Sequence, residues 1–114
     1  MAKRKIYIAG KITGLTQNEV QLKFSNAEFE LEKIGFNVVN PVKVVNDWQT
    51  TWDEAMKKCL RALKECDAII LLPCWVDSKG AKFERLFAEA FDIPIFYYTN
   101  KALYVLESLT QKNS

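Results

Sequence analysis

Four short apolar segments, each bounded by turn residues, are typical of β-strands: residues 4–9, 36–39, 68–72 and 95–98. Segment 68–72 has no polar alternation, which is typical of a strand buried on both faces of a parallel sheet. Elsewhere apolar residues recur at steps of three and four, which predicts amphipathic helices. The first helix runs from a cap at Thr16 to Gly35, the second begins near Thr51, and the others cover 82–91 and 101–111. Residues 42–51 are expected to form a connection.

Strands and helices therefore alternate along the chain, which predicts a parallel sheet covered by helices on both faces. We expect one domain over residues 1–114 with an α/β, Rossmann-like or flavodoxin-like three-layer sandwich fold. Its four-stranded parallel sheet should have the order 2-1-3-4. Ligands of such sheets bind beyond the carboxyl ends of the strands, where the strand order reverses. Here that point lies between the first and third strands, and it brings residues 10–14 close to residues 75–84.

Composition narrows the possible chemistry. Hydrophobic residues make up 49% of the 114 and charged residues 26%, as in globular proteins, and the net charge of +2 gives no reason to expect nucleic acid as a partner. The chain has no histidine, so Cys/His zinc sites and histidine-assisted nucleophiles are excluded. Three cysteines without a C-x-x-C motif favour a reducing compartment. With no signal peptide and no apolar span, we expect a cytoplasmic protein without membrane contact.

Three polar side chains are expected to approach the crevice: Tyr7 in the first strand, Asp67 before the third, and Glu84 in the third helix. Ser78 and Gly80 precede this helix, where backbone N–H groups and the helix dipole favour an anion. Each residue also has an ordinary structural explanation, as a core tyrosine, a strand-start aspartate or a helix-stabilising acid. Their convergence at one place makes the functional interpretation about as strong as the structural one.

Other positions stay open. The Asn40-Pro41 pair either ends the second strand or lines the crevice. Trp48 could close over a ligand, although packing is the more ordinary role for a loop tryptophan. Trp52 is expected to pack against its own helix.

Three motifs resemble those of the nucleoside 2-deoxyribosyltransferase superfamily: YIAGKITG at 7–14, CDAIILLP at 66–73 and SKGAKFE at 78–84. The superfamily includes the deoxynucleoside 5′-monophosphate N-glycosidases, and the chain is most similar to its small bacterial and phage branch. The S-x-G-x-x-x-E spacing carries most of the resemblance, because two glycines after a first strand are a weak signal. Residues 42–51 align with no pattern of the superfamily.

The resemblance implies a glutamate nucleophile that attacks C1′ of a 2′-deoxynucleoside or its 5′-monophosphate and displaces the base. Glu84 matches this nucleophile, Tyr7 the tyrosine that positions it, and Asp67 an acid that assists proton transfer at the base. Ser78 matches a serine that contacts the 5′-phosphate, although its neighbour Asp77 also fits the acid that holds the sugar in the transferases.

The resemblance further implies a substrate-binding set around these residues. It comprises Gly10, Lys11, Ile12, Trp75, Asp77, Ser78, Gly80 and Ala81. No metal or cofactor is expected, because a carboxylate nucleophile needs none. The expected partners are a small nucleoside or nucleotide and further copies of the chain, in a homodimer or larger homo-oligomer.

Two alternatives belong to other functional classes. The chain could be a module that binds a nucleotide or an ADP-ribose-like ligand without turnover. It could also be an interaction domain whose crevice has no function, which a Tyr7 sealed in the core would favour.

Overall fold

A computed structural model describes the backbone of residues 4–112 and the side chains of residues 4–108. The strands are β1 (Lys5–Ala9), β2 (Asn37–Val39), β3 (Ala68–Leu71) and β4 (Ile95–Tyr97). The helices are α1 (Gln17–Lys33), α2 (Pro41–Val45), α3 (Trp52–Lys64), α4 (Lys79–Ala90) and α5 (Asn100–Lys112), with a 3-10 turn, η1 (Pro73–Asp77), before α4. Each predicted strand and helix is present within a few residues of its expected bounds.

The sheet confirms the predicted topology. Its strand order is β2-β1-β3-β4, and all three pairs of neighbours are parallel. In the register of the central pair, Ile6 lies beside Ala68 and Ala9 beside Leu71. All four residues of β3 are buried, as its unbroken apolar run predicted. The order reverses between β1 and β3, so the carboxyl ends of these two strands define the switch point.

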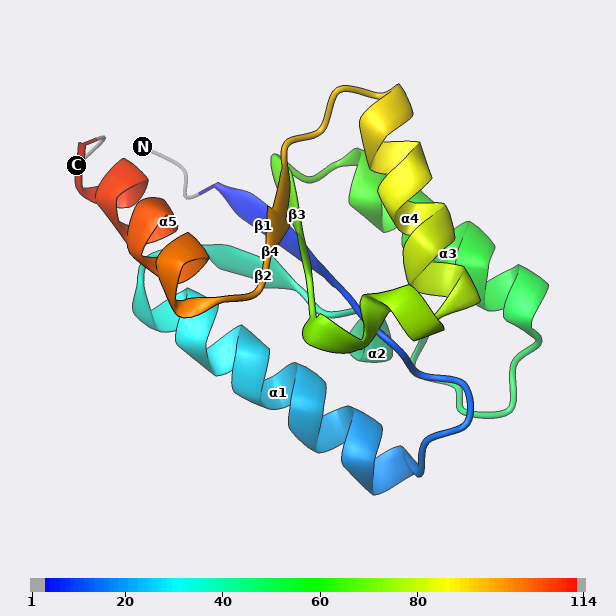
Figure 1. The fold of residues 1–114 in the computed structure, drawn as a ribbon. Helices are drawn as coiled ribbons and strands as arrows, with labels where there is room; N and C mark the ends of the chain where they lie inside the picture. The colour runs from blue at the N-terminus through cyan, green and yellow to red at the C-terminus, as the bar shows by residue number, and fades with distance from the viewer. Residues whose placement is uncertain (1–3, 113–114) are drawn as a thin grey trace.

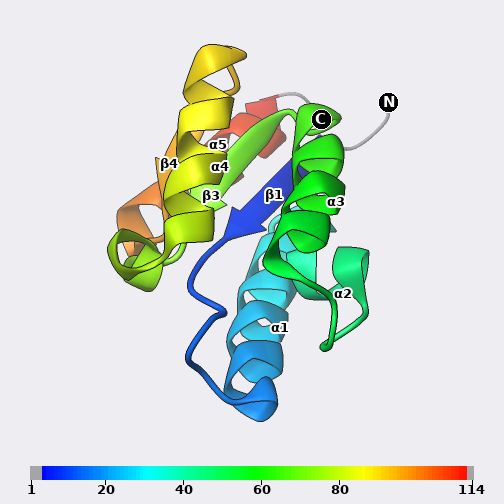
Figure 2. The same ribbon diagram turned by 90° about the vertical axis from the view of Figure 1, so that its right-hand side faces the viewer.

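Helices cover both faces of the sheet (Figures 1 and 2), with α1 and α5 on one side and α3 and α4 on the other. Alternate residues of β1 point to opposite faces. Ile6 and Ile8 join the core that contains α1 and Leu106 of α5. Tyr7 and Ala9 join the core on the opposite face, which includes side chains of α3 and α4. This alternation decides which strand side chains can reach a site between α3 and α4.

Side-chain caps set where the helices next to the switch point begin. Thr16, Thr51 and Ser78 are the N-caps of α1, α3 and α4, and each accepts a hydrogen bond from a backbone N–H three residues later. Thr16 was predicted in this role, and the second helix was predicted to begin near Thr51. Because Ser78 also caps a helix, α4 begins at Lys79 rather than near residue 82. Glu84 is therefore the sixth residue of α4, beyond the first turn.

The connection expected over residues 42–51 is partly helical. Asn40 caps the short helix α2, with Pro41 as its first residue. Asn46 ends it in the left-handed conformation, at φ 47°. The turn carries the following loop, residues 46–51, toward the carboxyl end of β1.

Among residues 4–112, no helix combines the length and the apolar character that crossing a bilayer requires.

Candidate functional site

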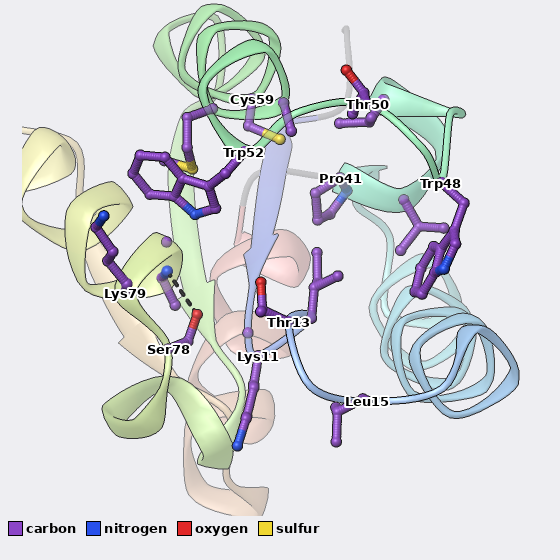
Figure 3. Close-up of a pocket in the computed structure, with 18 of the residues that line it drawn as sticks. Lys11, Thr13, Leu15, Pro41, Trp48, Thr50, Trp52, Cys59, Ser78 and Lys79 are labelled. Atoms are coloured by element: carbon purple, nitrogen blue, oxygen red, sulfur yellow. Dashed lines mark hydrogen bonds between the residues drawn. The ribbon is translucent and has the colours of Figure 1, made fainter.

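A pocket of about 880 Å³ opens at the switch point. Its walls come from the loop after β1 (residues 10–15), the start of α1, α2 and the loop that follows it, residues 52–59 of α3, and the start of α4. Pockets of this size accommodate ligands as large as a nucleotide. Figure 3 shows Trp52 and Trp48 on opposite sides of this space, with Thr13 between them.

Glu84 forms part of the pocket wall and is nearly buried, with 5% of its surface exposed. Its partner is Tyr7, whose hydroxyl donates a hydrogen bond to Glu84 Oε2. Tyr7 is fully buried and does not itself line the pocket. By itself this burial would suit a core residue, but the hydroxyl reaches the pocket through the carboxyl group. Tyr7 is therefore linked to the pocket by its hydrogen bond to Glu84.

Burial dominates the electrostatics of this pair. It raises the pKa of Glu84 to about 8, and the hydrogen bond from Tyr7 offsets only part of the increase. The pKa of Tyr7 is raised well above its ordinary value, first by burial and then by the charge of Glu84. Carboxyl groups with such a raised pKa are concentrated in functional sites, so Glu84 is the leading candidate for chemistry.

The start of α4 offers hydrogen-bond donors to an anion. Ser78 Oγ accepts a hydrogen bond from the backbone N–H of Ala81 at 3.1 Å (Figure 3), and Ser78, Lys79, Gly80 and Ala81 all line the pocket. The Lys79 ammonium lies 4.3 Å from the centre of the Trp52 ring. A helix N-terminus beside a lysine favours a phosphate or a carboxylate.

The glycine loop brings backbone close to the pocket. A Cβ atom added to Gly10 would lie 3.0 Å from Leu72 Cδ1, closer than side chains ordinarily pack. Gly14 has φ +89°, a conformation that side chains rarely adopt. The backbone N–H of Lys11 donates to Cys74 Sγ at 3.3 Å, which ties the loop to η1. The glycines are therefore needed where the sequence analysis placed them.

Most of the predicted binding residues line this one pocket. They are Gly10, Lys11, Ile12, Asp77, Ser78, Gly80 and Ala81, together with Glu84.

The prediction that Asp67 belongs to the site is wrong, because Asp67 does not line the pocket. Its backbone N–H and its carboxylate bind the backbone of Lys5, with Lys5 N 2.8 Å from Asp67 Oδ2. Lys5 begins β1, whereas the pocket lies at the carboxyl ends of the strands. Asp67 is thus at the opposite edge of the sheet, because it precedes β3 and does not follow it.

The prediction that Trp75 binds the substrate is also wrong, because Trp75 does not line the pocket. Its ring packs against Tyr97 at a centroid distance of 5.8 Å, and Arg85 lies over it. The predicted loop forms the turn η1, which directs Trp75 toward β4 and away from the ligand space.

The structure answers two questions that the sequence left open and adds two residues to the pocket. Trp48 and Pro41, both left open, line the pocket, as does Thr13 of the loop expected at the crevice, whereas Asn40 caps α2 and donates to Glu28. Trp52 was expected only to pack against its own helix and Cys59 was not singled out, yet both line the pocket. Trp52 and Cys59 are seven residues apart on α3, and this helical spacing places both on one face. That spacing was the available signal, but nothing in the sequence distinguished the pocket-facing side of α3 from its core-facing side.

Residues 4–112 contain no group of three or more His, Cys, Asp or Glu side chains arranged to hold a metal ion.

Fold and site together define the class of protein: a doubly wound α/β domain with a ligand pocket at its topological switch point. The chain belongs to the family described as "Domain of unknown function (DUF4406)", whose model matches residues 4–97. No curated protein matches the sequence. Among solved structures, the chain is similar to the solution structure of BlsM, with a TM-score of 0.64 and 20% identity. The match covers 97% of this chain and 74% of BlsM. At this identity the likeness supports the fold and carries no statement about activity.

Proposed function

We propose that this protein cleaves or transfers the N-glycosidic bond of a 2′-deoxynucleoside or its 5′-monophosphate, with Glu84 as the nucleophile. The observation that carries the proposal is the nearly buried Glu84 carboxyl group in the pocket wall, held by the Tyr7 hydroxyl. The S-x-G-x-x-x-E motif, which resembles that of the nucleoside 2-deoxyribosyltransferases, points to the same residue.

The chemistry needs Glu84 in its ionised form. The carboxylate attacks C1′ while the C1′–N bond breaks and its electron pair leaves with the base. A bond between C1′ and the Glu84 oxygen then holds the deoxyribosyl group until water or a second base attacks C1′ and restores the carboxylate. Tyr7 fixes the carboxyl group and stabilises its charged form, which suits a nucleophile that works in a nearly dry site.

The start of α4 supports a role for a 5′-phosphate. Ser78 caps the helix, and Lys79 and Gly80 follow it on the same stretch of pocket wall. Trp48 and Trp52 supply aromatic surface elsewhere in the pocket. Such surface suits the planar base of a nucleoside.

The decisive experiment incubates the pure protein with a panel of 2′-deoxynucleosides and their 5′-monophosphates, with and without an acceptor base. We expect free or exchanged base from at least one substrate. Glu84→Gln should lower kcat/KM by roughly 10³-fold or more, equivalent to about 4 kcal/mol of transition-state stabilisation.

Glu89→Gln is the matched control, because Glu89 lies on the same helix with a side chain that is 65% exposed and outside the pocket. It should retain wild-type activity. If no base appears with any substrate, the glycosidic reaction is wrong. Tight binding of a nucleotide without turnover, unchanged in Glu84→Gln, would identify a binding module in its place.

A further inference from the structure

We propose that Lys23 and Cys74 form an oxidative modification site, where a peroxide joins the lysine nitrogen to the cysteine sulfur through a single oxygen atom. The site lies outside the ligand pocket, since neither residue lines it. The inference is therefore independent of the proposed function.

The distance between the two side chains carries the inference. Lys23 Nζ lies 2.6 Å from Cys74 Sγ. A charged N–H donor usually lies about 2.7–2.9 Å from an oxygen acceptor, and sulfur is a larger atom than oxygen. The backbone N–H of Lys11 donates to the same sulfur, with an N–S distance of 3.3 Å. The Lys23 nitrogen is therefore closer to Cys74 than an ordinary hydrogen bond to sulfur would place it.

The same distance is too long for a direct bond between nitrogen and sulfur. Even a bond between two sulfur atoms measures only about 2.05 Å, and nitrogen is smaller than sulfur. Backbone atoms that share one bonded neighbour lie about 2.5 Å apart, and bonds to sulfur are longer than those between backbone atoms. The spacing of Lys23 and Cys74 thus matches a nitrogen and a sulfur with one small atom between them.

The surroundings admit a small oxidant and hold the pair in place. Both side chains are partly exposed, so peroxide can reach them. Lys23 belongs to α1 and Cys74 to η1, and Cys74 packs against the core on the α1 face of the sheet. Because the sulfur also accepts from the Lys11 N–H, the pair lies next to the glycine loop. The modification would cross-link α1 to the turn that precedes α4.

The reaction balances with two molecules of hydrogen peroxide. Cys74, reacting as a thiolate, attacks one peroxide oxygen, and the departing hydroxide takes a proton from the Lys23 ammonium as water. This leaves a sulfenic acid and a free amine. The second peroxide converts the amine to a hydroxylamine and releases water. The hydroxylamine oxygen then bonds to sulfur, and the sulfenic oxygen leaves as a third water. Two molecules of a dithiol reverse the cross-link to thiol, amine and water, and each becomes a disulfide.

The test treats the reduced full-length protein with hydrogen peroxide and follows intact mass and tryptic peptides. We expect a mass increase of one oxygen less two hydrogens, which dithiothreitol reverses. Trypsin should no longer cut after Lys23, and the peptide that contains Lys23 should be joined to the one that contains Cys74. Fragment masses distinguish Cys74 from Cys66, which shares its tryptic peptide.

Matched variants show whether this pair alone is responsible. Lys23→Met and Cys74→Ser should each abolish the cross-link. Lys33→Met, on the same helix, should keep it, and so should Cys66→Ser, whose native thiol donates to the Ala62 carbonyl.

Thermal unfolding gives a second readout. The cross-link joins residues that are 51 positions apart and so restricts the unfolded chain. Peroxide should raise the Tm of the wild type by about 10 °C, and it should not raise the Tm of Lys23→Met.

The proposal is overturned if Cys74 gains whole oxygen atoms while trypsin still cuts after Lys23, which indicates ordinary sulfenic or sulfinic acid. A product two hydrogens lighter than the reduced protein, which is a direct nitrogen–sulfur bond, also overturns it. So does a Cys74 that peroxide leaves unmodified, or a cross-link that survives in Lys23→Met.

Discussion

At the scale of single residues, Glu84 is a carboxyl group placed where its charge is poorly solvated. Its hydrogen bond comes from the Tyr7 hydroxyl. The pKa of Glu84 is shifted by burial and by this hydrogen bond, and not by the lysines of the pocket. Burial therefore favours the neutral form, and its pKa rises from 4.5 to about 8. A group held in this way lowers the stability of the protein whenever it is charged.

This placement predicts how stability depends on pH. The pKa of Glu84 is higher in the folded than in the unfolded chain, so the folded state binds more protons between about pH 4.5 and 8. The free energy of unfolding should therefore fall as pH rises through this window. Relative to Glu84→Gln, the wild type should lose on the order of a few kcal/mol between pH 5 and pH 8. Urea denaturation of both proteins at several pH values measures the difference.

Glu89→Gln is again the control, and its curve should run parallel to that of the wild type. Equal pH dependence in the wild type and in Glu84→Gln would contradict a buried, neutral carboxyl group at position 84.

Residue-scale prediction from the sequence was accurate where topology alone decides the place of a side chain. Glu84 lies in the first half of α4, the helix that follows β3, so topology places it at the carboxyl edge of the sheet. Asp67 precedes the same strand, and the same reasoning should have placed it at the opposite edge. Trp75 could not be placed, because the 3-10 turn that redirects it has no distinctive sequence pattern beyond Pro73.

At the scale of elements, the N-terminus of α4 combines two roles in one side chain. Ser78 caps the helix and lines the pocket, whereas Thr16 caps α1 in the same way without lining it. Substitutions of these two residues can therefore be compared: both should affect helix stability, and only that of Ser78 should affect ligand binding.

Ser78→Ala and Thr16→Ala should each lower the free energy of unfolding by about 1 kcal/mol, the usual contribution of such a cap. Only Ser78→Ala should also weaken recognition of a 5′-monophosphate, raising KM about tenfold relative to the free nucleoside, which corresponds to ~1.4 kcal/mol. Denaturation curves and steady-state kinetics measure the two effects. An equal change of KM in both variants would contradict a phosphate contact at the start of α4.

Element boundaries show why part of the pocket was missed. Helix α2 has its signals in the sequence, with Asn40 as cap, Pro41 at the first position and Asn46 after the last turn. The segment is only five residues long, too short for a helical period to appear. The loop that contains Trp48 directly follows α2 and lines the pocket. Because α2 was not predicted, the sequence left the position of Trp48 open.

At the scale of the whole molecule, the order 2-1-3-4 followed from the alternation of strands and helices, because right-handed crossovers leave few arrangements. The pocket position followed from the same rule. The positions of Trp48 and Trp52 in the pocket wall did not follow from this rule, because they depend on which face of α3 turns toward α2.

Assembly is the remaining prediction at this scale. We expect a homodimer or larger homo-oligomer, as the resemblance implies. The exposed apolar side chains Phe83 and Leu86 on α4 are consistent with a surface that is covered in solution. Light scattering on the purified protein should give at least twice the chain mass of 13.1 kDa. A mass of one chain at all concentrations tested would contradict this expectation.

The central claim is that Glu84 forms a bond to C1′, and rapid chemical quenching tests it most directly. A productive 2′-deoxynucleoside or 5′-monophosphate is mixed with the enzyme, quenched within the first turnover, and the protein is digested for peptide mass mapping. The account predicts one added deoxyribosyl group on the peptide that contains Glu84, and none in Glu84→Gln. Release of base by the wild type with no adduct at any quench time, or with an adduct on another residue, would contradict it.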